Sequence, residues 1–234
     1  MDLITDGGLI VWFWAAVAVS VIAPRLPFGR TVLYPFALLG TWAHEMGHGV
    51  TAILFGGRFR RLEVHRNLGG LAFHSGVRGV GRAAVAAGGL LAPAVVGGAV
   101  IVLGAREQTA PWILAGVAAS LILSLLLFVR NGFGWLALSL IAAALTAIAV
   151  LAPENVRIFL AQLIGIQFCM ASWGSLHYLF TRHVRRSDGT VMDSDTQQIA
   201  NVMLLPYWFW GGLIAVMSFA ILSASFYVAW VAPA

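Results

Sequence analysis

The sequence predicts an all-α polytopic membrane protein with about seven transmembrane helices and a short β-hairpin after the second. Composition is the first reason: 60% of the 234 residues are hydrophobic, only 10% are charged, and the mean hydropathy is +0.90. A water-soluble core of this size does not need so many apolar residues. The second reason is the length of the apolar runs, because a helix needs about 20 such residues to cross the hydrocarbon layer. The third is one segment that alternates polar and apolar residues.

The apolar runs that are long enough to span a membrane cover residues 8–24, 32–55, 80–104, 110–129, 132–151, 156–181 and 205–230. Pro206 could break the last run or turn it back. The first run follows acidic residues and lacks a basic flank, so we expect a retained helix and not a cleaved signal peptide. No stretch remains for a soluble domain, and we therefore expect a single transmembrane domain over residues 1–234.

The charged residues lie between the apolar runs. The 14 basic residues are all arginine, and most of them follow the second, fourth and sixth runs. This distribution predicts that those connections lie in the cytoplasm and that the surroundings are a lipid bilayer. No soluble segment combines a basic stripe with stacking aromatic residues, so we expect no nucleic-acid partner.

Residues 60–75 alternate apolar and polar side chains on both sides of Asn67-Leu68-Gly69-Gly70. This pattern predicts a β-hairpin with its turn at these four residues. The plainer interpretation is a surface loop. The functional interpretation is an edge strand to which an extended peptide could add by backbone hydrogen bonds.

The second apolar run contains the segment His44-Glu45-Met46-Gly47-His48. Two histidines four residues apart project from one face of a helix and can chelate one zinc ion. Glu45 lies beside that face, where it could take a proton from an attacking water and return it to the leaving amine. The segment therefore predicts zinc ligands at His44 and His48 and a general base at Glu45.

Glu45 is the only acidic residue inside the apolar runs. A lone carboxylate in lipid costs at least about 2.5 kcal/mol on insertion scales, which favours a functional reason for its presence. A polar cluster that joins helices and a metal site without proteolysis are the alternatives.

The chain resembles the site-2 protease family of intramembrane zinc metallopeptidases, in its small bacterial branch without a PDZ domain. The resemblance rests on residues 44–57, the hairpin, the Gly/Pro-rich residues 87–99 and the late residues 193–200. It implies a transmembrane metalloprotease domain that cleaves peptide bonds of membrane proteins in or near the lipid. It also implies that the hairpin helps to hold the substrate and that the membrane is the bacterial inner membrane.

The third zinc ligand is left open. A catalytic zinc ion commonly has three protein ligands, and the family usually takes the third from an aspartate in a Leu-Asp-Gly context, which has no clean copy here. Asp195 is the first choice, because Ser194-Asp195 resembles the late Ser-Asp element of the branch, although either residue could instead cap a helix. His177 is a rival, because it lies at a membrane depth similar to that of His44 and His48. Asp188 is the other rival, although it retains only the Asp-Gly pair of the Leu-Asp-Gly context.

The resulting hypothesis is a zinc-dependent endopeptidase with Glu45 as general base and acid. A helical substrate must unwind before its carbonyl becomes accessible, because helical backbone groups are already hydrogen-bonded to one another. The alternative hypothesis is a non-catalytic membrane subunit. Such a subunit would pack into a larger membrane protein complex through its small-residue helices, and the nine tryptophans fit interface anchors in both cases.

Overall fold

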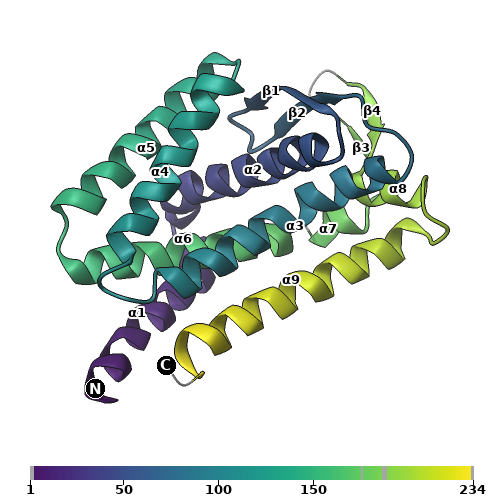
Figure 1. Cartoon of the computed structure of the whole chain (residues 1–234). Helices are drawn as coiled ribbons and strands as arrows, with labels where there is room; N and C mark the ends of the chain where they lie inside the picture. The colour runs from purple at the N-terminus through teal and green to yellow at the C-terminus, as the bar shows by residue number, and fades with distance from the viewer. Residues whose placement is uncertain (1–2, 175, 186–188, 233–234) are drawn as a thin grey trace.

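The structure is a computed structural model that describes residues 3–174, 176–185 and 189–232. Its helices are α1 (Leu3–Ile22), α2 (Gly29–Leu54), α3 (Val80–Leu103), α4 (Ala110–Leu127), α5 (Gly132–Leu151), α6 (Glu154–Gly174), α7 (Leu176–Leu179), α8 (Asp195–Ala200) and α9 (Tyr207–Trp230). Its strands are β1 (Arg58–Val64), β2 (Gly70–Ser75), β3 (His183–Arg185) and β4 (Val191–Asp193), which pair as two antiparallel hairpins. The second hairpin and the short helix α8 lie at the end of the bundle where α9 begins (Figure 1).

Among the described residues, α3, α4, α5 and α9 are each long and apolar enough to span a membrane. A fifth candidate is the pair α1 and α2, whose axes meet at 119° across a short break, as in a broken span or a re-entrant loop. The structure thus supports four to five spans, and the expected count of seven is not confirmed. The first two expected spans are this bent pair, which turns at Phe28 (φ 62°) directly before α2.

Helix α6 covers most of the expected sixth span but is not one of the candidate spans. Glu154, Arg157, Gln162 and Gln167 interrupt its apolar sequence. It packs against α1, α2, α3, α4 and α9, and many of its side chains, Phe168 among them, are buried. An interior helix that is covered by other helices does not need a continuous apolar surface.

The expected hairpin is confirmed as β1 and β2. Its tip lies along α2, because the hydroxyl of Tyr34 donates to the carbonyl of Arg66 at 2.8 Å and the hydroxyl of Thr41 donates to the carbonyl of Leu68 at 2.9 Å. Thr41 comes one helical turn before His44. These two bonds therefore place the start of β2 beside the histidine motif.

The connection between α4 and α5 covers the outer edge of β1. The backbone N–H of Leu62 donates to the carbonyl of Phe128 at 2.8 Å, and that of Arg130 donates to the carbonyl of Leu62 at 3.0 Å. The side chain of Asn131 accepts from the N–H of Val64 at 3.2 Å and donates to its carbonyl at 2.7 Å. In the described part of the chain no strand pairs with the opposite edge of the hairpin, which belongs to β2.

Candidate metal centre

Helix α2 presents two imidazoles side by side. His44 and His48 are four residues apart and so lie on one face of the helix. Their Nε2 atoms are 3.1 Å apart, and their rings meet edge to face with centroids 4.6 Å apart. His48 is buried and His44 is partly exposed, so the pair lies at the edge of the packed interior and remains accessible at His44.

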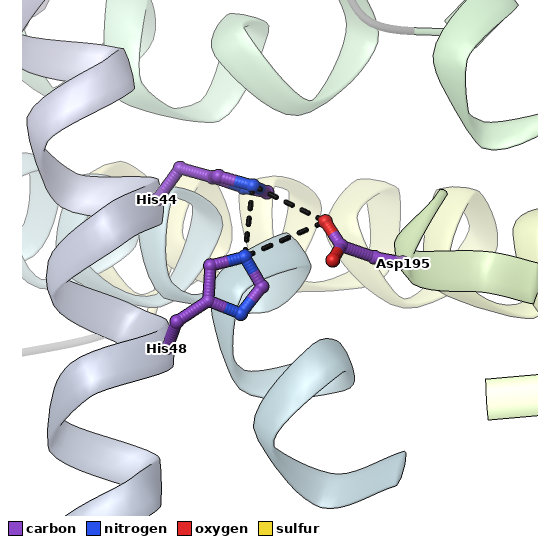
Figure 2. Close-up of side chains that lie close together, drawn as sticks. All are labelled: His44, His48 and Asp195. Atoms are coloured by element: carbon purple, nitrogen blue, oxygen red, sulfur yellow. Dashed lines mark hydrogen bonds and ion pairs between the residues drawn. The ribbon is translucent and has the colours of Figure 1, made fainter. Parts of the chain in front are cut away.

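Asp195, the first residue of α8, completes the group from the other side. Its Oδ2 atom lies 3.3 Å from Nε2 of His44 and 3.4 Å from Nε2 of His48. Figure 2 shows both rings directed at this carboxylate across the gap between α2 and α8. The three residues are a group that could hold a metal ion.

The three separations can be compared with those of a zinc site. Bonds of about 2.0–2.1 Å arranged as a tetrahedron place neighbouring ligand atoms roughly 3.3 Å apart. The measured separations of 3.1, 3.3 and 3.4 Å are close to this value. Two imidazole nitrogens and one carboxylate oxygen are also donors that zinc accepts at catalytic sites, where the fourth position stays open. The group therefore fits a tetrahedral divalent ion in both chemistry and spacing.

Helix α3 fixes the orientation of the His48 ring. Nδ1 of His48 lies 2.9 Å from the carbonyl oxygen of Val85. A carbonyl can only accept, so Nδ1 carries a proton, and Nε2, which faces Asp195, is the ring atom that can serve as a metal ligand. Gly89 permits this approach, because a Cβ atom there would lie 2.2 Å from Cε1 of the ring.

Ser194 caps α8 and leaves the Asp195 side chain available. The N–H of Gln197 donates to Oγ of Ser194 at 3.2 Å, which is the bond of an N-cap residue. Asp195 is buried, with 5% of its surface exposed. Burial alone would raise the pKa of this carboxyl, but the imidazoles of His48 and His44 lower it to well below its usual range. The carboxylate is thus held in its anionic form, which a cation requires.

Tyr178 is a residue of this site that sequence reasoning missed. Its hydroxyl donates to Oδ2 of Asp195 at 2.9 Å, and the N–H of Asp195 donates to the same hydroxyl at 3.3 Å. Its ring also lies edge to face with that of His44, at 6.4 Å between centroids. The only sequence signal was its position beside His177, at the end of an apolar run.

Of the two rival third ligands, only His177 lies among the described residues, and it does not join the group. His177 is exposed on α7 and does not belong to the metal-binding group of described residues. Asp188 lies outside the described residues. Asn201, just after α8, donates to Asp193 at 2.7 Å and accepts from Gln197 at 2.6 Å.

Glu45 lies between the histidines and the hairpin. Only 7% of its surface is exposed, and the backbone N–H of Ala72 on β2 donates a hydrogen bond to its carboxylate. A Cβ atom on Gly70 would lie 2.5 Å from both Cγ and Oε1 of Glu45. The glycine at the start of β2 therefore makes room for this carboxylate.

Comparison with known proteins gives one match. A family model described as Peptidase M50B-like matches residues 10–225. No curated protein and no solved structure matches the chain. The matched region includes the histidine motif, the hairpin, Tyr178 and Asp195, and the chain belongs to the Peptidase M50B-like family, a family of site-2 proteases.

Proposed function

We propose that this protein is a zinc-dependent endopeptidase that cleaves membrane-spanning or membrane-proximal peptides, in a bacterial inner membrane. One observation carries the proposal: Nε2 of His44, Nε2 of His48 and Oδ2 of Asp195 lie 3.1–3.4 Å apart, next to the buried carboxylate of Glu45. These three atoms would be the protein ligands. A zinc ion held there would act as a Lewis acid toward water and the scissile carbonyl.

Glu45 is the general base and general acid of the proposed reaction. Its carboxylate would take a proton from the attacking water and give it to the leaving amine as the peptide bond breaks. Its position one residue after His44 places it beside the face that carries both imidazoles. The N–H of Ala72 would hold it there.

The free edge of β2 is the proposed substrate site. Residues that face each other in an antiparallel pair direct their backbone groups either at one another or both outward. Leu62 and Val64 direct theirs outward, to the α4–α5 connection and Asn131. Their partners Ala72 and Gly70 consequently direct theirs away from β1, which for Ala72 is toward Glu45.

This arrangement supports a substrate that binds as an extended strand. A helix that unwinds loses its internal hydrogen bonds, and the backbone groups of Gly70 and the carbonyl of Ala72 would replace some of them. Because the α4–α5 connection covers the β1 edge, the β2 edge next to Glu45 is the one left to bind the substrate. We expect membrane segments that unwind easily to be preferred over stable apolar helices.

The test uses the full chain in lipid nanodiscs with two synthetic single-span peptides, one of uninterrupted leucine and one with a central Asn-Gly pair. The zinc content of the protein is measured by elemental mass spectrometry. The cleavage products are identified by peptide mass spectrometry. We expect the wild type to bind zinc and to cleave the Asn-Gly peptide faster. Glu45→Gln should retain zinc and lose about 10²–10⁴-fold in cleavage rate.

Equal cleavage by wild type and Glu45→Gln would overturn the proposed mechanism. A wild-type protein that binds no zinc and copurifies at fixed stoichiometry with other membrane proteins would instead favour the non-catalytic subunit.

A further inference from the structure

We infer that Tyr178 is a positioning residue for the proposed third ligand, Asp195. The inference rests on the proposed function, because it assigns a role to Tyr178 through the metal that Asp195 would bind. The hydroxyl of Tyr178 contacts the same oxygen, Oδ2, that faces both imidazoles.

The two hydrogen bonds between Tyr178 and Asp195 hold the aspartate from two directions. The tyrosine hydroxyl donates to the side chain at 2.9 Å and accepts from the backbone N–H at 3.3 Å. A hydroxyl has one proton to donate and lone pairs to accept, so both bonds can form together. Besides the imidazoles, Gln198 also contacts the carboxylate, with its Nε2 3.4 Å from Oδ1. The tyrosine thus controls where Oδ2 lies, and Gln198 holds the second oxygen more loosely.

Asp195 lies on a small element, because helix α8 runs only from Asp195 to Ala200, and an isolated helix of this length is not stable in water. Tyr178 also lies on a short helix, α7, but it is followed by Leu179, which is 1% exposed. Helix α9 packs closely on that residue, since a Cβ atom on Gly211 would lie 2.4 Å from the Leu179 carbonyl oxygen. The hydroxyl is therefore presented from a buried, well-packed point.

A purely structural role makes a different prediction from a positioning role. If the ring only filled space beside His44, phenylalanine would replace tyrosine without effect on metal binding. If the hydroxyl orients Oδ2, its loss allows the carboxylate to rotate away from the imidazoles. Loss of a hydrogen-bond partner behind a metal ligand typically costs 10–100-fold in metal affinity.

The experiment is a double-mutant cycle on the full chain in nanodiscs. Zinc affinity is measured by competition with a chromogenic chelator for wild type, Tyr178→Phe, Asp195→Ala and the double variant. We expect Tyr178→Phe to weaken zinc binding about 10–100-fold in the wild-type background. In the Asp195→Ala background it should have no further effect, because the residue acts through Asp195. Tyr227→Phe is the matched control, since Tyr227 is 56% exposed on α9.

A second readout does not depend on activity or on zinc affinity. Cobalt(II) is loaded in place of zinc, and its visible absorption, which reports coordination geometry, is recorded for wild type, Tyr178→Phe and Tyr227→Phe. The spectrum should change for Tyr178→Phe alone. Thermal unfolding of each apoprotein shows whether the variants are folded.

Three results would overturn the inference while leaving the proposed function intact. They are unchanged zinc affinity in a folded Tyr178→Phe variant, an equal loss on both backgrounds of the cycle, and an unchanged cobalt spectrum. Failure of the wild type itself to bind zinc or cobalt would instead overturn the proposed function.

Discussion

The two sides of the candidate metal centre are built in different ways. On one side, a single long helix, α2, places His44, Glu45 and His48 by its own periodicity. On the other side, the six-residue helix α8 presents Asp195, and side-chain hydrogen bonds from a distant segment hold it. The difference teaches that one candidate metal site can combine a locally encoded half with a half that exists only through tertiary contacts.

The α2 side is rigid because its neighbours pack against it closely. Helix α3 approaches His48 through Gly89 and accepts a hydrogen bond at the carbonyl of Val85. Strand β2 approaches Glu45 through Gly70. Changes on this side should act through steric displacement. Changes on the α8 side other than removal of Asp195 itself should act through the loss of single hydrogen bonds, with smaller effects.

The largest effect is expected from removal of the proposed ligand on the α8 side. Asp195→Ala leaves two imidazoles, so zinc affinity should fall by more than about 100-fold, the upper value for loss of an outer partner. His177→Ala is the matched test of the rival ligand and should bind zinc like the wild type. Chelator competition measures both. The opposite ranking of the two variants would move the third ligand to α7.

Gly89→Ala should produce a large effect on the α2 side. The added Cβ atom would lie 2.2–2.5 Å from three atoms of the His48 ring, so the ring must shift. We expect zinc affinity to fall by about 100-fold, in line with the cost of misplacing a group by roughly 1 Å. Gly116→Ala is the control, because nothing lies within 4 Å of a Cβ atom at that position on α4. Equal zinc binding by the two variants would show that α3 does not constrain His48.

Gly70→Ala separates the base from the metal ligands. The new methyl group would displace the Glu45 carboxylate, because its three nearest neighbours are all atoms of the Glu45 side chain. We expect cleavage of the Asn-Gly peptide to fall by about 10–100-fold, with zinc content unchanged. Loss of zinc together with cleavage would mean that the hairpin supports the whole centre and not Glu45 alone.

The smallest effect is expected from the helix cap on the α8 side. Ser194→Ala removes the acceptor for the N–H of Gln197, a change that typically costs about 1 kcal/mol. Zinc affinity should fall by roughly 5-fold, because the metal-bound state requires α8 to be ordered. Ser223→Ala, at an exposed position on α9, is the control. A loss of zinc affinity as large as that of Asp195→Ala would contradict the view that each hydrogen bond on the α8 side contributes only a little to zinc binding.

Much of the fold was predictable because its signals are local. The alternation around residues 67–70 predicted the hairpin, and the structure confirms it as β1 and β2. The apolar runs predicted helices in nearly the right places, but their length could not show that the axes of α1 and α2 meet at 119°. Nor could it show that other helices cover α6. Run length shows which segments are long enough to cross lipid, but the arrangement of the helices depends on how they pack against one another.

The sequence by itself determined the membrane character of the chain, its resemblance to the site-2 protease family, and the grouping of His44, Glu45 and His48. These depend on composition and on the 3.6-residue period of one helix, which act over a few residues. Only the tertiary structure decided that Asp195 faces the imidazoles while His177 does not, that Tyr178 holds Asp195, and that β2 carries the free edge. Those contacts join residues far apart in the chain, and their geometry depends on how the helices pack around α3 and α6.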